Sequence, residues 1–105
     1  MSLSNFRLPS PQPDLGFVRI IADEGKIRAV AQIARDIIED AFPNEDYRRD
    51  RFALVDRNLG VISPIIQAKF DASDYTDFAD LLGIVSGNDK LIIIDRADLA
   101  GQHLQ

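Results

Sequence analysis

The chain has 105 residues, 46% of them hydrophobic, a formal net charge of −5 at pH 7 and no cysteine. This composition predicts one folded domain and excludes overall disorder, a disulfide framework and a cysteine-ligated zinc site. The N-terminus does not resemble a secretory signal, and no apolar run has membrane-spanning length. The acidic balance argues against nucleic acid and membranes as partners and permits a basic partner. Together with the absence of cysteine, it fits a cytoplasmic protein.

Residues 1–13 contain three prolines and follow neither the helical nor the strand period. They are predicted to form an extended, mobile arm, in which Phe6 and Leu8 are suited to dock on the domain or on a partner. Residues 14–96 are assigned to a single α+β domain. Residues 97–105 are assigned to a polar C-terminal tail.

The first part of the domain is predicted to be a strand followed by a long helix. Leu15–Ile21 is apolar and β-branched, which is typical of a strand. Asp23–Phe42 places its apolar residues on one half of a helical wheel, with Asp23 as N-cap and Pro43 ending the helix. This amphipathic helix is expected to pack against a sheet, and the rest of the domain to be organised around it.

The charged connector Pro43–Arg51 holds the densest basic cluster of the chain, and acidic residues are interleaved with it. Guanidinium groups bind carboxylates and phosphates well, and a neighbouring tyrosine can stack on a ligand. The alternative is a solvated loop that pairs with itself. The candidate contacts for an anion or a partner are Tyr47, Arg48, Arg49 and Arg51.

Phe52–Asp56 and Gly60–Ser63 are predicted as two strands joined by a turn at Asn58. The next residues, Pro64–Phe70, are open to two interpretations. The alternation of apolar and polar residues favours a bulged strand. A short helix capped by Ser63, with the proline at its first position, is the other possibility.

Asp71–Val85 carries its apolar residues on one helical face and is predicted to be the second helix, with Gly87 just beyond its end. Lys90–Asp95 is predicted to be the last strand, followed by the tail or a short final helix. Three-residue steps fan side chains around a helix, so the regularly spaced aspartates do not predict a metal site. These aspartates are Asp71, Asp74, Asp77 and Asp80.

The predicted order of strand, helix, strand, strand, helix, strand matches the ferredoxin-like βαββαβ sandwich. Only the topology is shared, because no family motif accompanies it. If Pro64–Phe70 is helical, the alternative is a small three-layer α/β domain with a short parallel sheet.

The last predicted strand is apolar on both faces, although a half-exposed strand should alternate. In the ferredoxin-like topology this strand lies at the sheet edge, where unpaired backbone groups and an apolar face would bind a partner. The arm, the tail, a second copy of the chain or a different protein could cover it. The predicted partner-binding residues are Leu91, Ile92, Ile93 and Ile94.

The sequence therefore predicts a non-catalytic protein–protein interaction or regulatory module that forms a homodimer. An acidic inhibitor or immunity-like protein is a specific version of this hypothesis. One alternative is a small-molecule-sensing regulatory domain, and another is a small enzyme that uses aspartates with the arginines of the 48–51 loop. His103 has no recognisable nucleophile setting, and a glycine-rich phosphate loop is lacking. No metal or other cofactor is predicted.

Overall fold

The computed structural model describes residues 2–9, 16–42, 51–78 and 89–102. Within these ranges a mixed five-stranded sheet combines with four helices, so the predicted α+β class is confirmed. The strands are β1 (Ser4–Arg7), β2 (Phe17–Glu24), β3 (Ile27–Ala34), β4 (Thr76–Phe78) and β5 (Asp89–Ile94). The helices are α1 (Arg35–Ala41), α2 (Arg51–Arg57), α3 (Leu59–Asp71) and α4 (Arg96–Leu99).

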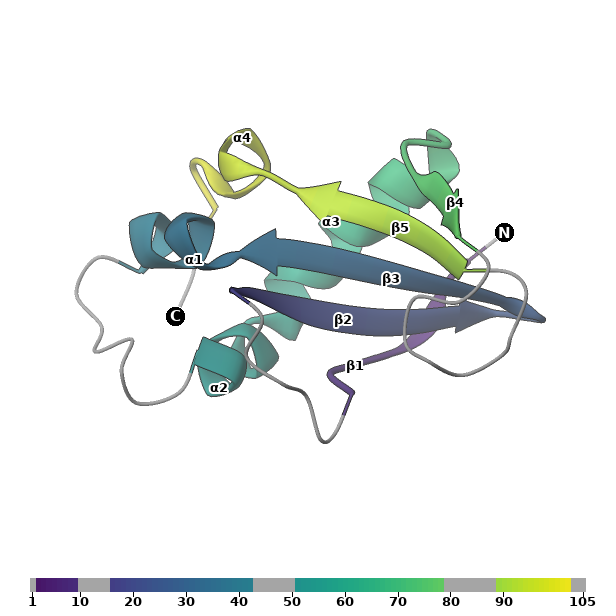
Figure 1. Cartoon of the computed structure of the whole chain (residues 1–105), viewed down its shortest axis with the longest axis horizontal. Coiled ribbons are helices and arrows are strands. Elements are labelled where there is room, and N and C mark those ends of the chain that lie inside the picture. The colour runs from purple at the N-terminus through teal and green to yellow at the C-terminus, as the bar shows by residue number, and fades with distance from the viewer. Residues whose placement is uncertain (1, 10–15, 43–50, 79–88, 103–105) are drawn as a thin grey trace.

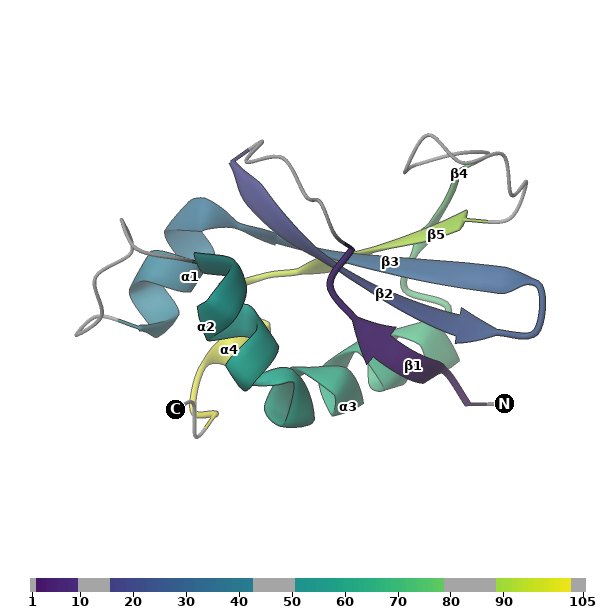
Figure 2. The same cartoon turned by 90° about the horizontal axis from the view of Figure 1, so that it is seen from below.

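The strands lie side by side in the order β1-β2-β3-β5-β4 (Figure 1). Neighbours are antiparallel except for β3 and β5, which are parallel. This is not the predicted ferredoxin-like order, because β2 and β3 form a hairpin with no helix between them. The three-layer alternative with a parallel sheet is also wrong, since the sheet is mixed and α2 and α3 lie together on one side of it (Figure 2).

The predicted helix Asp23–Phe42 is wrong over most of its length, because residues 23–34 belong to the hairpin. Gly25 and Lys26 form its two-residue turn. Gly25 has a φ of 57°, which glycine adopts at little cost because it has no Cβ. Glycine at the first position of a two-residue turn is a hairpin signal, and the sequence prediction placed this residue in a helix instead.

The helical pattern arose because β3 is buried on both sides. Ala29, Ala31 and Ile33 face one side of the sheet and Val30 faces the other, and all of them are buried. A strand that is apolar on both sides fills a broad half of a helical wheel, so periodicity alone cannot separate the two structures. Helix begins only at Arg35, with α1.

Two helices replace the predicted strands Phe52–Asp56 and Gly60–Ser63. Asn58 joins α2 to α3, and its Nδ2 donates a hydrogen bond of 2.8 Å to the carbonyl of Leu54. The side chain thereby satisfies a backbone group at the end of α2. The buried residues of this stretch recur at helical spacing: Leu54, Val55, Asn58, Ile62 and Ile66.

The helical interpretation of Pro64–Phe70 is confirmed, but Pro64 lies inside α3 and not at its first position. Proline has no N–H to donate to the carbonyl of Gly60, and Gly60 lies at an exposed position near the start of the helix. α3 ends at Asp71, so the predicted helix Asp71–Val85 is wrong as far as β4 extends. Residues 79–85, together with Gly87, lie outside the described residues.

Part of the predicted N-terminal arm lies on the domain. β1 pairs with β2 at one edge of the sheet, and the N–H of Leu3 donates a hydrogen bond of 2.7 Å to Gln67 Oε1 on α3. Phe6 and Leu8 pack against the core. At the other end of the chain, β5 confirms the last predicted strand, and α4 is the short final helix.

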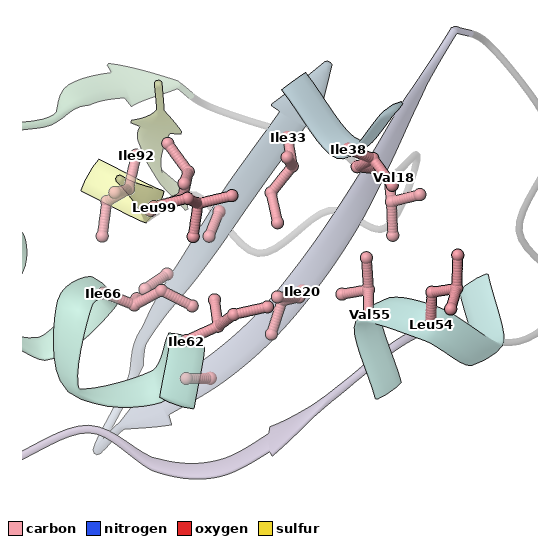
Figure 3. Close-up of a cluster of buried hydrophobic side chains, with 14 of the residues drawn as sticks. Val18, Ile20, Ile33, Ile38, Leu54, Val55, Ile62, Ile66, Ile92 and Leu99 are labelled. Carbon is pink, nitrogen blue, oxygen red and sulfur yellow. The ribbon is translucent and has the colours of Figure 1, made fainter. Parts of the chain in front are cut away.

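The core fills the space between the sheet and the helices (Figure 3). Burial of these side chains is the main stabilising term of the fold. We call this side of the sheet the helix face. The buried cluster consists of Leu3, Val18, Ile20, Ala22, Ala29, Ala31, Ile33, Ile38, Phe42, Leu54, Val55, Ile62, Ile66, Ile92, Ile94 and Leu99.

None of the helices in the described ranges is long and apolar enough to cross a bilayer.

Candidate functional site

The sheet has a second face, which we call the open face because α2 and α3 lie on the other side (Figure 2). Cross-strand partners point to the same side of a sheet, so the register determines which side chains share this face. Its rows, read across the strands, are Phe17 and Ala34; Arg19, Gln32 and Ile93; Ile21, Val30, Leu91 and Thr76; and Asp23, Arg28 and Asp89.

Ile93 is the feature of this face that points to a contact. Its residue surface is 49% exposed, and among the described residues it is the large hydrophobic residue that lies open to solvent. Its row continues through Gln32 to Arg19, whose Nε donates a hydrogen bond of 3.4 Å to Gln32 Oε1. The Arg19 guanidinium also lies 4.8 Å from the ring centroid of Phe17. The exposed isoleucine therefore ends a row of polar side chains, as at the border of many contact surfaces.

The backbone beside Ile93 is the second feature. β4 pairs with β5 only over Asp89–Leu91. The rest of β5, Ile92–Ile94, pairs with β3 on one side and with no strand of the described part of the chain on the other. We call this stretch the outer margin of β5. Backbone groups on a sheet margin are a template for pairing with another chain.

These placements divide the four predicted partner-binding residues. The prediction that the last strand lies at the sheet edge is wrong for Leu91, which sits between β3 and β4 and is half-buried. Ile92 and Ile94 are 0% exposed and belong to the core. Ile93 alone of the four has its side chain available to a partner.

At the opposite end of the open face, Arg28 and Asp89 form a two-pronged ion pair. The Arg28 Nε–Asp89 Oδ1 distance is 2.8 Å, and the Nη2–Oδ2 distance is 2.5 Å. The Asp89 side chain is 0% exposed and that of Arg28 is 12% exposed. Fork-to-fork pairing satisfies a carboxylate that burial would otherwise destabilise. This pair joins β3 to β5, and its role is structural.

Two grooves flank α4 on the helix side of the molecule. One, of about 460 Å³, lies between α1 and α4 and includes Ile37, Asp40 and Leu99. The other, of about 540 Å³, lies between α3 and α4 and includes Ile65 and Lys69. Gln102 lines both grooves. Volumes of this size fit small ligands. The sequence prediction missed these grooves, because they are formed by residues far apart in the chain.

Charged groups at these grooves are paired. Lys69 Nζ lies 3.0 Å from Asp98 Oδ2 and 3.3 Å from Asp74 Oδ2. Partial burial lowers the pKa of Lys69, but the hydrogen bonds and charges of the two carboxylates outweigh this and leave the pKa raised. Arg96 bonds Asp36 and Asp40, and these carboxylates raise its pKa in the same way.

The predicted anion-contact cluster is largely untested. Tyr47, Arg48 and Arg49 lie outside the described residues, as does His103. Arg51 is the first residue of α2 and is half-buried. The cluster therefore stays a prediction.

Three of the regularly spaced aspartates have a cationic or amide partner. Asp71 accepts a hydrogen bond of 2.9 Å from Gln67 Nε2, Asp74 pairs with Lys69, and Asp77 pairs with Lys90. Asp80 lies outside the described residues. Within the part of the chain that the structure describes, no three acidic or histidine side chains come together to hold a metal ion.

Comparison with known proteins adds no relative. A scan against protein-family models found no match, and neither a search of curated proteins nor a search of solved structures found one.

Proposed function

We propose that the chain is a non-catalytic protein-interaction module that self-associates through the open face around Ile93. The observation that carries this proposal is the 49% exposure of Ile93 on the sheet face opposite α2 and α3. A single exposed apolar residue is common, so its position matters more than its exposure. Ile93 lies within the outer margin of β5, where side-chain contact and backbone pairing can both contribute.

A second copy of the chain is the proposed occupant because a two-fold axis near Ile93 would bring the two isoleucines together. Isologous contacts of this kind are the commonest way in which identical chains associate. Burying the exposed half of one isoleucine contributes roughly 1 kcal/mol, half the value for a fully buried side chain. The association is therefore expected to be weak, and its detection requires a series of protein concentrations.

The test is the solution mass of the full chain and of Ile93→Asp, measured by size-exclusion chromatography with light scattering. The wild type should approach twice the monomer mass of 11.7 kDa as concentration rises, and Ile93→Asp should remain monomeric. Ala68→Asp is the matched control, because Ala68 is exposed on α3 and the change adds the same charge away from the open face.

Two outcomes would contradict the proposal, and one control is required. A wild type that stays monomeric at every concentration contradicts self-association, and attention then moves to a foreign partner. Equal dimerisation of both variants would place any interface away from Ile93. Far-UV circular dichroism must show that Ile93→Asp is folded, since an unfolded variant would also fail to pair.

The ligand-sensing alternative has a separate observation in its favour, the two grooves beside α4. Both combine apolar walls with charged residues: Asp40 and Arg96 in one, Lys69 and Asp98 in the other. Such combinations can bind a small molecule that has an apolar body and a charged group. Thermal stabilisation by one such compound, with the mass unchanged, would favour this function over self-association.

A further inference from the structure

α4 is attached to the domain differently from the longer helices. It spans four residues and contributes one buried side chain, Leu99, which is 7% exposed. α3 spans 13 residues, with Ile62 and Ile66 buried. Since Leu99 is the one buried residue of α4, apolar burial holds this helix at one point only. Just beyond α4, Gly101 has a φ of 76°, a conformation that glycine adopts without strain.

Ion pairs also link α4 to the helices on either side of it. On one side, Asp98 Oδ2 lies 3.0 Å from Lys69 Nζ of α3. On the other side, Arg96 Nη2 lies 3.0 Å from Asp36 Oδ2 of α1, and Arg96 Nε donates to Asp40 Oδ2. Arg96 and Asp98 thus each reach across a groove to a neighbouring helix.

These ion pairs differ in their exposure to solvent. The side chains of Arg96, Asp36 and Asp40 are 59%, 66% and 56% exposed. Those of Lys69 and Asp98 are 15% and 21% exposed. Salt screens exposed pairs strongly and partly buried pairs less, so every link except the Leu99 contact weakens as ionic strength rises.

The start of α4 is stabilised from within the segment. Asp95 accepts a hydrogen bond from the backbone N–H of Asp98, and the Asp98 side chain accepts one from the backbone N–H of Asp95. This reciprocal capping box needs no partner outside α4. The beginning of the helix therefore does not depend on contacts with α1 or α3.

We propose that α4 is a latch that detaches from α1 and α3 and loses its helical turn while the sheet and α3 remain folded, and that ionic strength controls how often it opens. Gln102 lines both grooves, and the residues of α4 separate them. Opening would therefore join the two grooves into one surface between α1 and α3. Local opening of weakly attached segments, at free energies below that of global unfolding, is common in small domains.

The test is native-state hydrogen exchange on the full chain, followed residue by residue. The reporters are the amides of Ala100, which donates to the Arg96 carbonyl at 3.0 Å, and Gln102, which donates to the Leu99 carbonyl at 3.2 Å. A four-residue helix detached from the domain is too short to be stable on its own, so both bonds break when α4 opens. The reference amides are those of Ile62 and Ile66 in α3. The reporters should exchange faster than the references. The ratio of the two rates should rise about 3- to 10-fold between low salt and about 1 M sodium chloride.

A pair of variants identifies the link that controls the latch. Lys69→Met removes the cation that bonds Asp98, and at low salt it should raise the same ratio several-fold. Lys26→Met is the matched control, because Lys26 is an exposed residue of the hairpin turn and the change removes the same charge. Exchange of the reporters only at the rate of the references would overturn the proposal. So would a ratio that does not respond to salt. If Lys69→Met does not fold, the salt dependence of the wild-type exchange ratio still tests the proposal.

Discussion

The two faces of the sheet are built from the same strands but are stabilised in different ways. On the helix face, the central rows are apolar across three strands: Val18, Ile33 and Ile94 form one, and Ile20, Ala31 and Ile92 the next. On the open face, a row with the buried Ile21 and Val30 lies between a row that contains Arg19 and Gln32 and a row that contains a buried ion pair. The helix face thus depends on packing volume. The open face depends more on paired polar side chains. It is also the face on which Ile93 is exposed to a partner.

Neighbouring isoleucines on β5 compare the two faces with the least chemical change. Ile92→Ala should lower the free energy of unfolding by roughly 2–5 kcal/mol, because Ile92 is 0% exposed and its truncation leaves a cavity. Ile93→Ala should cost less than about 1 kcal/mol, because Ile93 is 49% exposed. Urea denaturation checks both variants, at a protein concentration low enough to keep the chain monomeric. Equal losses would mean that the two faces are equally packed.

The ion pair of the open face is the next largest contribution. Asp89→Asn leaves the Arg28 guanidinium without its carboxylate and should lower the free energy of unfolding by about 2–3 kcal/mol. This is less than the 3–5 kcal/mol typical of a fully buried pair, because Arg28 keeps 12% exposure of its side chain. Urea denaturation measures the loss.

The control for the ion pair lies on the same face. Asp23→Asn breaks the pair with Arg7, whose two side chains are 39% and 36% exposed, and should cost at most about 1 kcal/mol. A double replacement, Arg28→Met with Asp89→Leu, should recover much of the stability, because no unpaired charge remains. If Asp89→Asn cost no more than Asp23→Asn, burial would not set the strength of the pair.

Sequence patterns predicted those parts of the fold that depend on local composition. The β-branched runs around Ile20 and Ile93 predicted β2 and β5, and the mixture of elements predicted the α+β class. The short apolar runs in 52–63 predict strands, but these residues form α2 and the start of α3. Apolar runs of that length fit either structure, and only packing against the sheet shows that Leu54 of α2 and Ile62 of α3 both lie in the core.

The candidate site was predicted only in outline, because it depends on tertiary placement. The sequence prediction included Ile93 among four partner-binding residues. It could not separate Ile93 from Ile92, since that distinction requires knowing which side of β5 the helices cover. Arg28 and Asp89 are 61 residues apart in the chain, and local periodicity carries no information about a pair at that distance. The grooves beside α4 were missed for the same reason.

The pair between Lys69 and Asp98 gives the smallest expected effect and the one that depends on pH. Burial raises the pKa of Asp98, but the hydrogen bonds within the capping box and the contact with Lys69 leave this pKa below its ordinary value of 3.8. Burial lowers the pKa of Lys69, and its two carboxylates leave this pKa above 10.5. A lowered carboxyl pKa stabilises the fold above pH 3.8, and this stability is lost as pH falls through the folded-state value. A raised lysine pKa stabilises the fold below pH 10.5, and this stability is lost as pH rises through the folded-state value.

Lys69→Met should therefore lower the free energy of unfolding by about 1 kcal/mol at neutral pH, and by less toward either extreme. The loss should diminish in acid as Asp98 becomes protonated, and in alkali as Lys69 loses its proton. Urea denaturation of both proteins from acid to alkaline pH measures this difference directly. A loss that stayed constant down to the acid limit would show that the charge of Lys69 does not stabilise the fold through its carboxylate partners. In that case salt should not weaken the Lys69–Asp98 link between α3 and α4. The salt-sensitive contacts of α4 would then be the exposed pairs of Arg96 with Asp36 and Asp40.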